Sequence, residues 1–200
     1  MSREPRSGDR RALERAASDL IRALPLDLSA DPELADSPAR IADYYLEALA
    51  GLAPGAEPEL ETFPRSGGDD LVVVRDLEFH SLCVHHFAPF FGRALIAYVP
   101  DAKLLGVSGA ARLLDFYARR PQLQERLTAQ IADHLERLLA PRGVAVALEA
   151  RHLCMEMRGV RRRAVLESRV TRGVLAAPEF AALLQFGPER ESGAGGTPGA

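Results

Sequence analysis

The most regular alternation of side chains in this protein runs through Gly143-Val144-Ala145-Val146-Ala147-Leu148-Glu149-Ala150-Arg151-His152-Leu153-Cys154. Successive side chains of a β-strand point to opposite faces, so the even-numbered residues share one face. That face is apolar as far as residue 150 and then carries an imidazole and a thiol. The pattern predicts a continuous strand that places His152 and Cys154 together at one end of a buried sheet.

A second segment, Ser81-Leu82-Cys83-Val84-His85-His86, contains the other cysteine. Together the two segments hold both cysteines and three of the five histidines. Cys83 and His86 lie three residues apart, a spacing at which one tight turn can present a thiolate and an imidazole to the same ion, and Cys154 can complete the set. Three nitrogen and sulfur ligands leave the fourth tetrahedral position of Zn²⁺ open to water, as in a catalytic zinc site.

Other interpretations of these residues stay open. The cysteines can be inert core thiols, or they can form a disulfide bond. His85 can act as a general acid or base or orient a ligand, or it can be a fourth ligand that closes the site. The charged residues 1–9 are followed by no apolar segment, so we expect a cytoplasmic protein whose thiols stay reduced.

Composition argues against two kinds of partner. A chain of 200 residues with 47% hydrophobic content predicts one globular domain with a proper core. No run of about 18 apolar residues is present, so we expect no membrane span. A formal net charge of −3 gives no general attraction to nucleic acid, and anion binding must come from local clusters of basic residues.

Arginines follow the second cysteine closely. Arg158 keeps the alternation of His152 and Cys154, so we expect it to extend the same face and to present two N–H groups to phosphate oxygens. The run Arg161-Arg162-Arg163 has two interpretations, as a phosphate-binding cluster or as solvated surface charge.

Hydrophobic periodicity predicts an α+β fold with an antiparallel β-rich core. Ser37-Pro38, Ser108 and Pro121 are expected to begin helices, the serines as N-caps and Pro121 as the first helical residue. We expect helices over residues 10–24, 37–49, 108–119, 121–139 and 178–186, and strands over residues 71–74, 92–99 and 143–154.

We expect an ordered middle of the chain and disordered ends. Residues 1–9 and 187–200 contain too little apolar surface to offset the entropy of ordering, so we expect both to be disordered. Residues 10–68 form an N-terminal helical region with a Gly/Pro/Glu-rich linker. Residues 69–186 form the catalytic domain.

Four blocks of the sequence resemble the corresponding blocks of a known enzyme family. They are Ser81-Leu82-Cys83-Val84-His85-His86-Phe87-Ala88-Pro89, Leu105-Gly106-Val107-Ser108, Arg119-Arg120-Pro121-Gln122-Leu123-Gln124-Glu125-Arg126-Leu127-Thr128 and His152-Leu153-Cys154-Met155-Glu156-Met157-Arg158-Gly159-Val160. In order and separation they closely resemble GTP cyclohydrolase I, over residues 35–186. The resemblance implies the tunnelling fold, an antiparallel sheet with two consecutive helices packed on it, preceded here by an N-terminal helical pair.

The resemblance also implies an assembly and a set of roles. It implies a homo-oligomer, a decamer of two pentameric rings, with active sites at subunit contacts. The matching positions are Cys83, His86 and Cys154 as zinc ligands, His85 and His152 as the groups that move protons, Glu125 and Gln124 at the guanine edge, Ser108 and Arg112 at the ribose and phosphate end, and Arg158 and Arg40 at the triphosphate. A carboxylate at position 125 accepts from N1–H and the exocyclic amine of guanine, which selects guanine over adenine. Taken alone, Glu125 can also be an exposed helix residue.

The implied activity is zinc-dependent hydrolysis of GTP. The imidazole ring of guanine opens, C8 leaves as formate, and 7,8-dihydroneopterin triphosphate forms, the first step of tetrahydrofolate and pterin biosynthesis. No redox or organic cofactor is implied.

Three features depart from the family pattern. Gly109 stands in place of a lysine directed at the triphosphate, Asp43 replaces a basic residue, and residues 161–171 lack the usual Ser/Thr-rich strand. Two alternatives therefore stay open: a divergent paralogue in specialised pterin or deazapurine synthesis, and a non-catalytic nucleotide-binding scaffold with a structural zinc.

Overall fold

A computed structural model describes residues 8–27, 30–68 and 71–187. The predicted disordered ends fall almost wholly outside these residues. The helices are α1 (Arg10–Arg22), α2 (Ser37–Ala48), α3 (Gly109–Ala118), α4 (Gln124–Leu139) and α5 (Leu153–Glu156). The strands are β1 (Thr62–Pro64), β2 (Val72–Cys83), β3 (Pro89–Val99), β4 (Lys103–Leu105), β5 (Pro121–Gln122), β6 (Gly143–His152) and β7 (Val165–Gly173).

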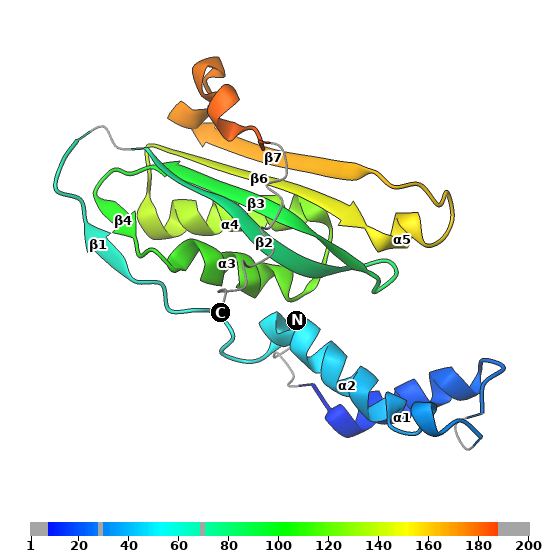
Figure 1. The fold of residues 1–200 in the computed structure, drawn as a ribbon. Helices are drawn as coiled ribbons and strands as arrows, with labels where there is room; N and C mark the ends of the chain where they lie inside the picture. Colours follow the sequence, from blue (N-terminus) through cyan, green and yellow to red (C-terminus); the bar gives the residue numbers. More distant parts are fainter. Residues whose placement is uncertain (1–7, 28–29, 69–70, 188–200) are drawn as a thin grey trace, which may run out of the picture.

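The main sheet has five strands in the order β5-β2-β3-β6-β7. All neighbours are antiparallel except β5, which is parallel to β2. Helices α3 and α4 lie against one face of this sheet (Figure 1). The α+β class and the antiparallel core are confirmed. Strands β1 and β4, which were not predicted, form a small separate sheet, so the expected linker contains a strand.

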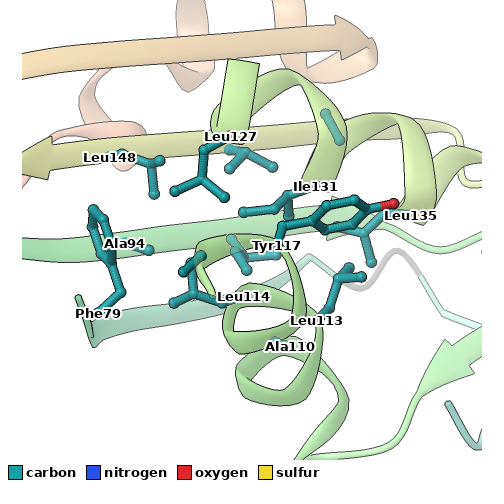
Figure 2. Packing of buried hydrophobic residues seen from close by; sticks show 14 of the residues in the cluster. Phe79, Ala94, Ala110, Leu113, Leu114, Tyr117, Leu127, Ile131, Leu135 and Leu148 are labelled. Atoms are coloured by element: carbon teal, nitrogen blue, oxygen red, sulfur yellow. The ribbon is translucent and has the colours of Figure 1, made fainter. Parts of the chain in front are cut away.

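The main core lies between the sheet and the helices α3 and α4 (Figure 2). Helix α4 turns an apolar stripe toward this core, in which Leu127, Ile131 and Leu135 are fully buried. Even-numbered residues of β6 face them, and odd-numbered Ala145 and Ala147 belong to a second cluster on the other face. Strand β6 is therefore buried on both sides, which explains its almost continuous apolar sequence.

Helices α1 and α2 pack on each other and lie away from the sheet (Figure 1). Arg10 joins them by donating from Nε and Nη2 to the carboxylate of Asp43, at 2.6 and 3.0 Å. The side chain of Asp9 accepts from the backbone N–H of Ala12 and caps α1, which begins at Arg10 as predicted. Asp43, which departs from the family pattern, thus has a structural partner within the pair.

The strand predicted to reach Cys154 ends at His152, so the prediction that Cys154 lies on this strand is wrong. His152 pairs with Phe90 on β3, and the next position on β3 is Pro89. Proline has no N–H to extend the ladder. The chain turns there into α5, a single helical turn that carries Cys154.

The helix predicted from Pro121 begins at Gln124 instead. Pro121 and Gln122 pair with β2, and the carbonyl of Gln122 accepts from the N–H of Val84 at 2.9 Å. The buried side chain of Gln122 also donates to the carbonyl of Tyr117. These bonds keep the chain extended up to position 123.

Other boundaries also differ from the predictions. Helix α1 ends at Arg22, and α2 has Asp36, not Ser37, at its N-cap position. The segment 178–186 forms two 3-10 turns rather than an α-helix, and residues 165–173 form a strand, β7, that was not predicted. None of the helices in the described part of the chain is long and apolar enough to cross a membrane.

One buried histidine lies far from the two cysteine-bearing segments. His134 on α4 has its Nδ1 atom 3.1 Å from the hydroxyl of Tyr117, and a carboxylate oxygen of Glu57 lies 3.9 Å from the same nitrogen. Burial lowers the pKa of His134 below its ordinary value of 6.5; Glu57 opposes this shift and Arg137 adds to it.

We expect His134 to make the protein less stable in mild acid. A histidine with a lowered pKa stays neutral in the folded chain while the unfolded chain takes up a proton, so stability is lost as the pH falls through the ordinary pKa. The melting temperature of His134→Gln, measured at about pH 7.5 and about pH 5.5, should fall less between the two pH values than that of the wild type. An equal fall in both proteins would contradict this role.

Candidate metal centre and active site

The turn between β2 and β3 carries the first candidate ligands. The carbonyl of Cys83 accepts from the N–H groups of His86 and Phe87 at 3.3 and 2.8 Å, and the N–H of Cys83 donates to Ala88. Phe87 has a positive φ of 51°, which lets the chain reverse within this short loop. The predicted turn between two strands, with Cys83 and His86 on it, is confirmed.

The turn at the end of β6 brings Cys154 to the same place. The ligand atoms of Cys83, His86 and Cys154 all lie within 4.8 Å of one another, and both cysteines are free thiols rather than a disulfide. The Sγ atom of Cys83 lies 3.9 Å from Nδ1 of His86. A tetrahedral zinc ion holds sulfur and nitrogen ligands about 3.6 Å apart. The donor set and its spacing therefore fit such an ion.

His85 is close to this group but outside it. Its Nδ1 atom lies 3.8 Å from Sγ of Cys83, yet His85 is not among the three residues whose ligand atoms converge. The arrangement is that of a three-ligand site, which leaves one tetrahedral position for water or substrate.

Burial raises the pKa of the Cys154 thiol, and the neighbouring Cys83 raises it further. Two thiols this close disfavour the loss of both protons, because two thiolates repel each other. A divalent cation reverses this balance by binding both as thiolates.

His152 is held on two sides. Its ring stacks on Phe90, with centroids 4.6 Å apart and planes 3° from parallel. Its Nε2 atom lies 2.9 Å from Oε1 of Gln124, while the amide nitrogen of Gln124 donates to the carbonyls of Leu148 and Leu166. Because the amide oxygen can only accept, the proton of the neutral His152 ring is on Nε2. Nδ1 is therefore the ring atom left for chemistry.

The charge of His152 is set by its surroundings. Burial lowers the pKa of His152, and the negative charge of Glu125 partly opposes this shift. Glu125 is exposed, in the first turn of α4. The adjacent Gln124 is 1% exposed, and the oxygen and the nitrogen of its side-chain amide both form hydrogen bonds inside the protein. The structure thus places the exposed carboxylate of Glu125 near His152 and holds the side chain of Gln124 by internal hydrogen bonds. The place of Gln124 at the guanine edge stays a prediction.

Arg158 lies against one of the candidate ligands. Its Nη1 atom is 2.6 Å from Nε2 of His86. A neutral imidazole has a single lone pair, so His86 can accept from Arg158 or bind a metal through Nδ1, but it cannot do both. Ligation of a metal by His86 consequently frees the guanidinium of Arg158 for another acceptor.

The remaining predicted site residues are not brought to the metal group within one chain. Arg40 on α2 pairs with Asp36 at 3.7 Å. Arg112 lines a cavity of about 460 Å³ between α3 and residues 50–58. Ser108 is exposed at the N-cap position of α3, and its side chain makes no capping hydrogen bond.

Gly109 is buried at the start of α3. A Cβ atom at this position would lie 2.6 Å from both Cγ and Cδ1 of Leu105. The absence of a lysine here therefore has a packing reason: no side chain fits unless Leu105 moves.

Comparisons with known proteins show the family of this chain. A family model described as GTP cyclohydrolase I matches residues 13–181. The chain belongs to the GTP cyclohydrolase I family of enzymes. The GTP cyclohydrolase 1 of Brucella anthropi is 49% identical over 152 residues, which cover 74% of this chain and 71% of that protein. The GTP cyclohydrolase 1 of Thermobifida fusca is 45% identical over 160 residues, covering 79% and 77%, and that of Streptococcus pneumoniae is 42% identical over 154 residues, covering 77% and 83%.

Sequence reasoning missed one residue that shapes the site of this GTP cyclohydrolase I family member, Phe90, and one role, that of Gln124 toward His152. Phe90 supports the ring of His152, and Gln124 orients it. The sequence contains a signal for Phe90, since an aromatic residue follows the Cys83–His86 turn at the start of a strand. It contains none for Gln124, because the carbonyls that Gln124 bonds are far away in the chain.

We expect the His152 ring to carry its proton on Nε2 at about pH 8, and ¹⁵N chemical shifts of the imidazole should show this single tautomer. Gln124→Met removes the acceptor and should give a mixture of both tautomers. Gln130→Met is the matched control, since Gln130 lies on the same helix and bonds Gln122 instead. A single Nε2–H tautomer in Gln124→Met would contradict the orienting role.

Gly109→Lys should destabilise the enzyme instead of adding a phosphate contact. Overpacking against Leu105 should lower the free energy of unfolding in urea by about 1–3 kcal/mol. In a Leu105→Ala background the same change should cost less, because the space is then open. Wild-type stability of the single variant would show that position 109 accepts a side chain freely.

Proposed function

We propose that this protein is a zinc-dependent GTP cyclohydrolase I, which hydrolyses the guanine imidazole ring of GTP, releases C8 as formate and forms 7,8-dihydroneopterin triphosphate. The convergence of Cys83, His86 and Cys154, with the oriented ring of His152 two residues before Cys154, carries the proposal. Membership of the family supports it.

Zinc is the metal that suits the donor set. Two thiolates and one imidazole favour Zn²⁺ over hard cations such as Mg²⁺ or Ca²⁺. When bound, zinc supplies a Lewis acid and lowers the pKa of water, which provides the nucleophile for ring hydrolysis. The cytoplasm suits the same residues, because two neighbouring thiols persist where glutathione keeps cysteines reduced.

The protein's own residues bind guanine and move protons. The free carboxylate of Glu125 accepts from N1–H and the 2-amino group of guanine, a pairing that adenine does not offer. Nδ1 of His152 takes up the proton that the attacking water loses and passes it to the departing ring nitrogen, while its Nε2–H stays bound to Gln124. His85 is a second proton carrier next to Cys83.

We assign phosphate binding to arginines. Arg158 becomes free for the triphosphate when His86 ligates the metal, and its guanidinium can bind two phosphate oxygens at once. We place Arg40, Arg112 and Ser108 in the same pocket through a neighbouring subunit, since within one chain they lie apart from the metal group.

The assembly that we propose is the tunnelling fold arranged as a homo-oligomer, a decamer of two rings. Strand β7 supports this assembly because it is an edge of the sheet and its Val165 and Leu166 are 53% and 42% exposed. An open edge with apolar side chains pairs readily with another strand.

The two alternatives from the sequence have less support. A closed structural site would need His85 as a ligand, and His85 lies outside the converging group. A divergent paralogue was suggested by Gly109, Asp43 and residues 161–171. Packing against Leu105 and the bond to Arg10 give structural reasons for the first two, and residues 165–171 belong to β7.

Purified protein incubated with GTP should release formate and, after oxidation, give pterin fluorescence.

Cys154→Ser should lose both zinc and turnover. Glu125→Gln should keep its zinc and lose about 1–3 kcal/mol in kcat/KM, because its amide N–H groups face the N–H groups of guanine. A Cys154→Ser protein with stoichiometric zinc and full activity would refute the ligand set, and normal turnover of GTP by Glu125→Gln would place the guanine contact elsewhere.

A further inference from the structure

Helix α5, which carries Cys154, is too short to hold its own shape. It has four residues, and its C-terminal end is closed by one bond, from the N–H of Met157 to the carbonyl of Leu153 at 2.9 Å. Isolated helices need about 12–15 residues to be even marginally stable in water. The position of Cys154 must therefore be imposed by contacts outside the helix.

Such a contact joins the two sides of the turn. Arg151, at the end of β6, donates from Nε and Nη2 to the two carboxylate oxygens of Glu156, at 3.0 and 2.6 Å. Arg151 lies three residues before Cys154 and Glu156 two residues after it. This two-bonded ion pair closes the chain around Cys154.

The pair is anchored to the sheet. The guanidinium of Arg151 lies 5.7 Å from the ring centre of Phe91, its partner in the β3–β6 register, and Phe91 in turn stacks on His80 of β2. The side chain of Glu156 is 13% exposed and that of Arg151 is 32% exposed. Partly buried, two-bonded pairs define geometry better than solvated single contacts do.

We propose that Arg151 and Glu156 are positioning residues that hold the thiol of Cys154 in place for the metal. This inference rests on the proposed function, in which Cys154 is a zinc ligand. Nothing in it requires the pair to touch the metal or the substrate. Its effect is to fix the orientation of the turn, so that the sheet and the ligand move together.

The test measures zinc affinity, by competition with a chromophoric chelator, in the full-length protein. Glu156→Gln keeps the shape of the side chain but loses the charge and one acceptor. It should weaken zinc binding about 10–100-fold, the usual effect of removing a residue that supports a metal ligand. With Co²⁺ in place of zinc, the visible absorption bands of the tetrahedral ion should change in the same variant.

Glu149→Gln is the matched control. Glu149 forms an ion pair with Arg93 on the same sheet, also partly buried, at a position away from α5. Its loss should leave zinc affinity and the Co²⁺ spectrum at wild-type values. The exchanged pair Arg151→Glu with Glu156→Arg restores opposite charges and should recover most of the affinity lost in Glu156→Gln.

The outcomes separate this inference from the proposed function. Wild-type zinc affinity in Cys154→Ser refutes the ligand set itself. Loss of zinc in Cys154→Ser together with wild-type affinity in Glu156→Gln overturns only the positioning role. Equal weakening in Glu156→Gln and Glu149→Gln also overturns it, since the effect would then follow general stability.

Discussion

The site depends on how β3 pairs with both of its neighbours at one end of the sheet. Phe90 lies opposite Ser81 on β2 and opposite His152 on β6. Cys83 and Cys154 follow two residues beyond those partners, so one register brings the two ligand turns together. A slip of one residue in either pairing would turn a ligand segment to the other face. The irregularity in β2, between Val74 and Leu77, lies toward the opposite end and leaves this register intact.

Much of the fold could be predicted because burial leaves a direct pattern in the sequence. The alternation in β6 and the hydrophobic periodicity of α4 follow from the faces that they bury, and a strand and a helix were predicted there. The ends of the helices and strands depend on contacts with other segments, which the sequence of a single segment does not reveal. Pro89 ends a strand about sixty residues further along the chain, and the extended conformation at Gln122 comes from its bonds to Tyr117 and Val84.

The candidate site, too, could be predicted only in part. Spacing alone pointed to Cys83, His86 and Cys154, because residue type and tight turns are local properties. The position of Cys154 on a helical turn, rather than on a strand, was not local and was missed. The internal role of Gln124 and the crowding at Gly109 were also missed, because both depend on atoms of remote segments, the carbonyls of Leu148 and Leu166 and the side chain of Leu105.

The distance between the two cysteines along the chain has a consequence for folding. A loop of about seventy residues separates Cys83 from Cys154, and the pairing of β2, β3 and β6 closes this loop in the folded chain, which an unfolded chain would have to do at a cost in conformational entropy. An ion that binds the folded chain and not the unfolded one would stabilise the finished sheet by mass action. A change that loosens β6 would consequently weaken the binding of such an ion as well, even when it lies far from the ligands.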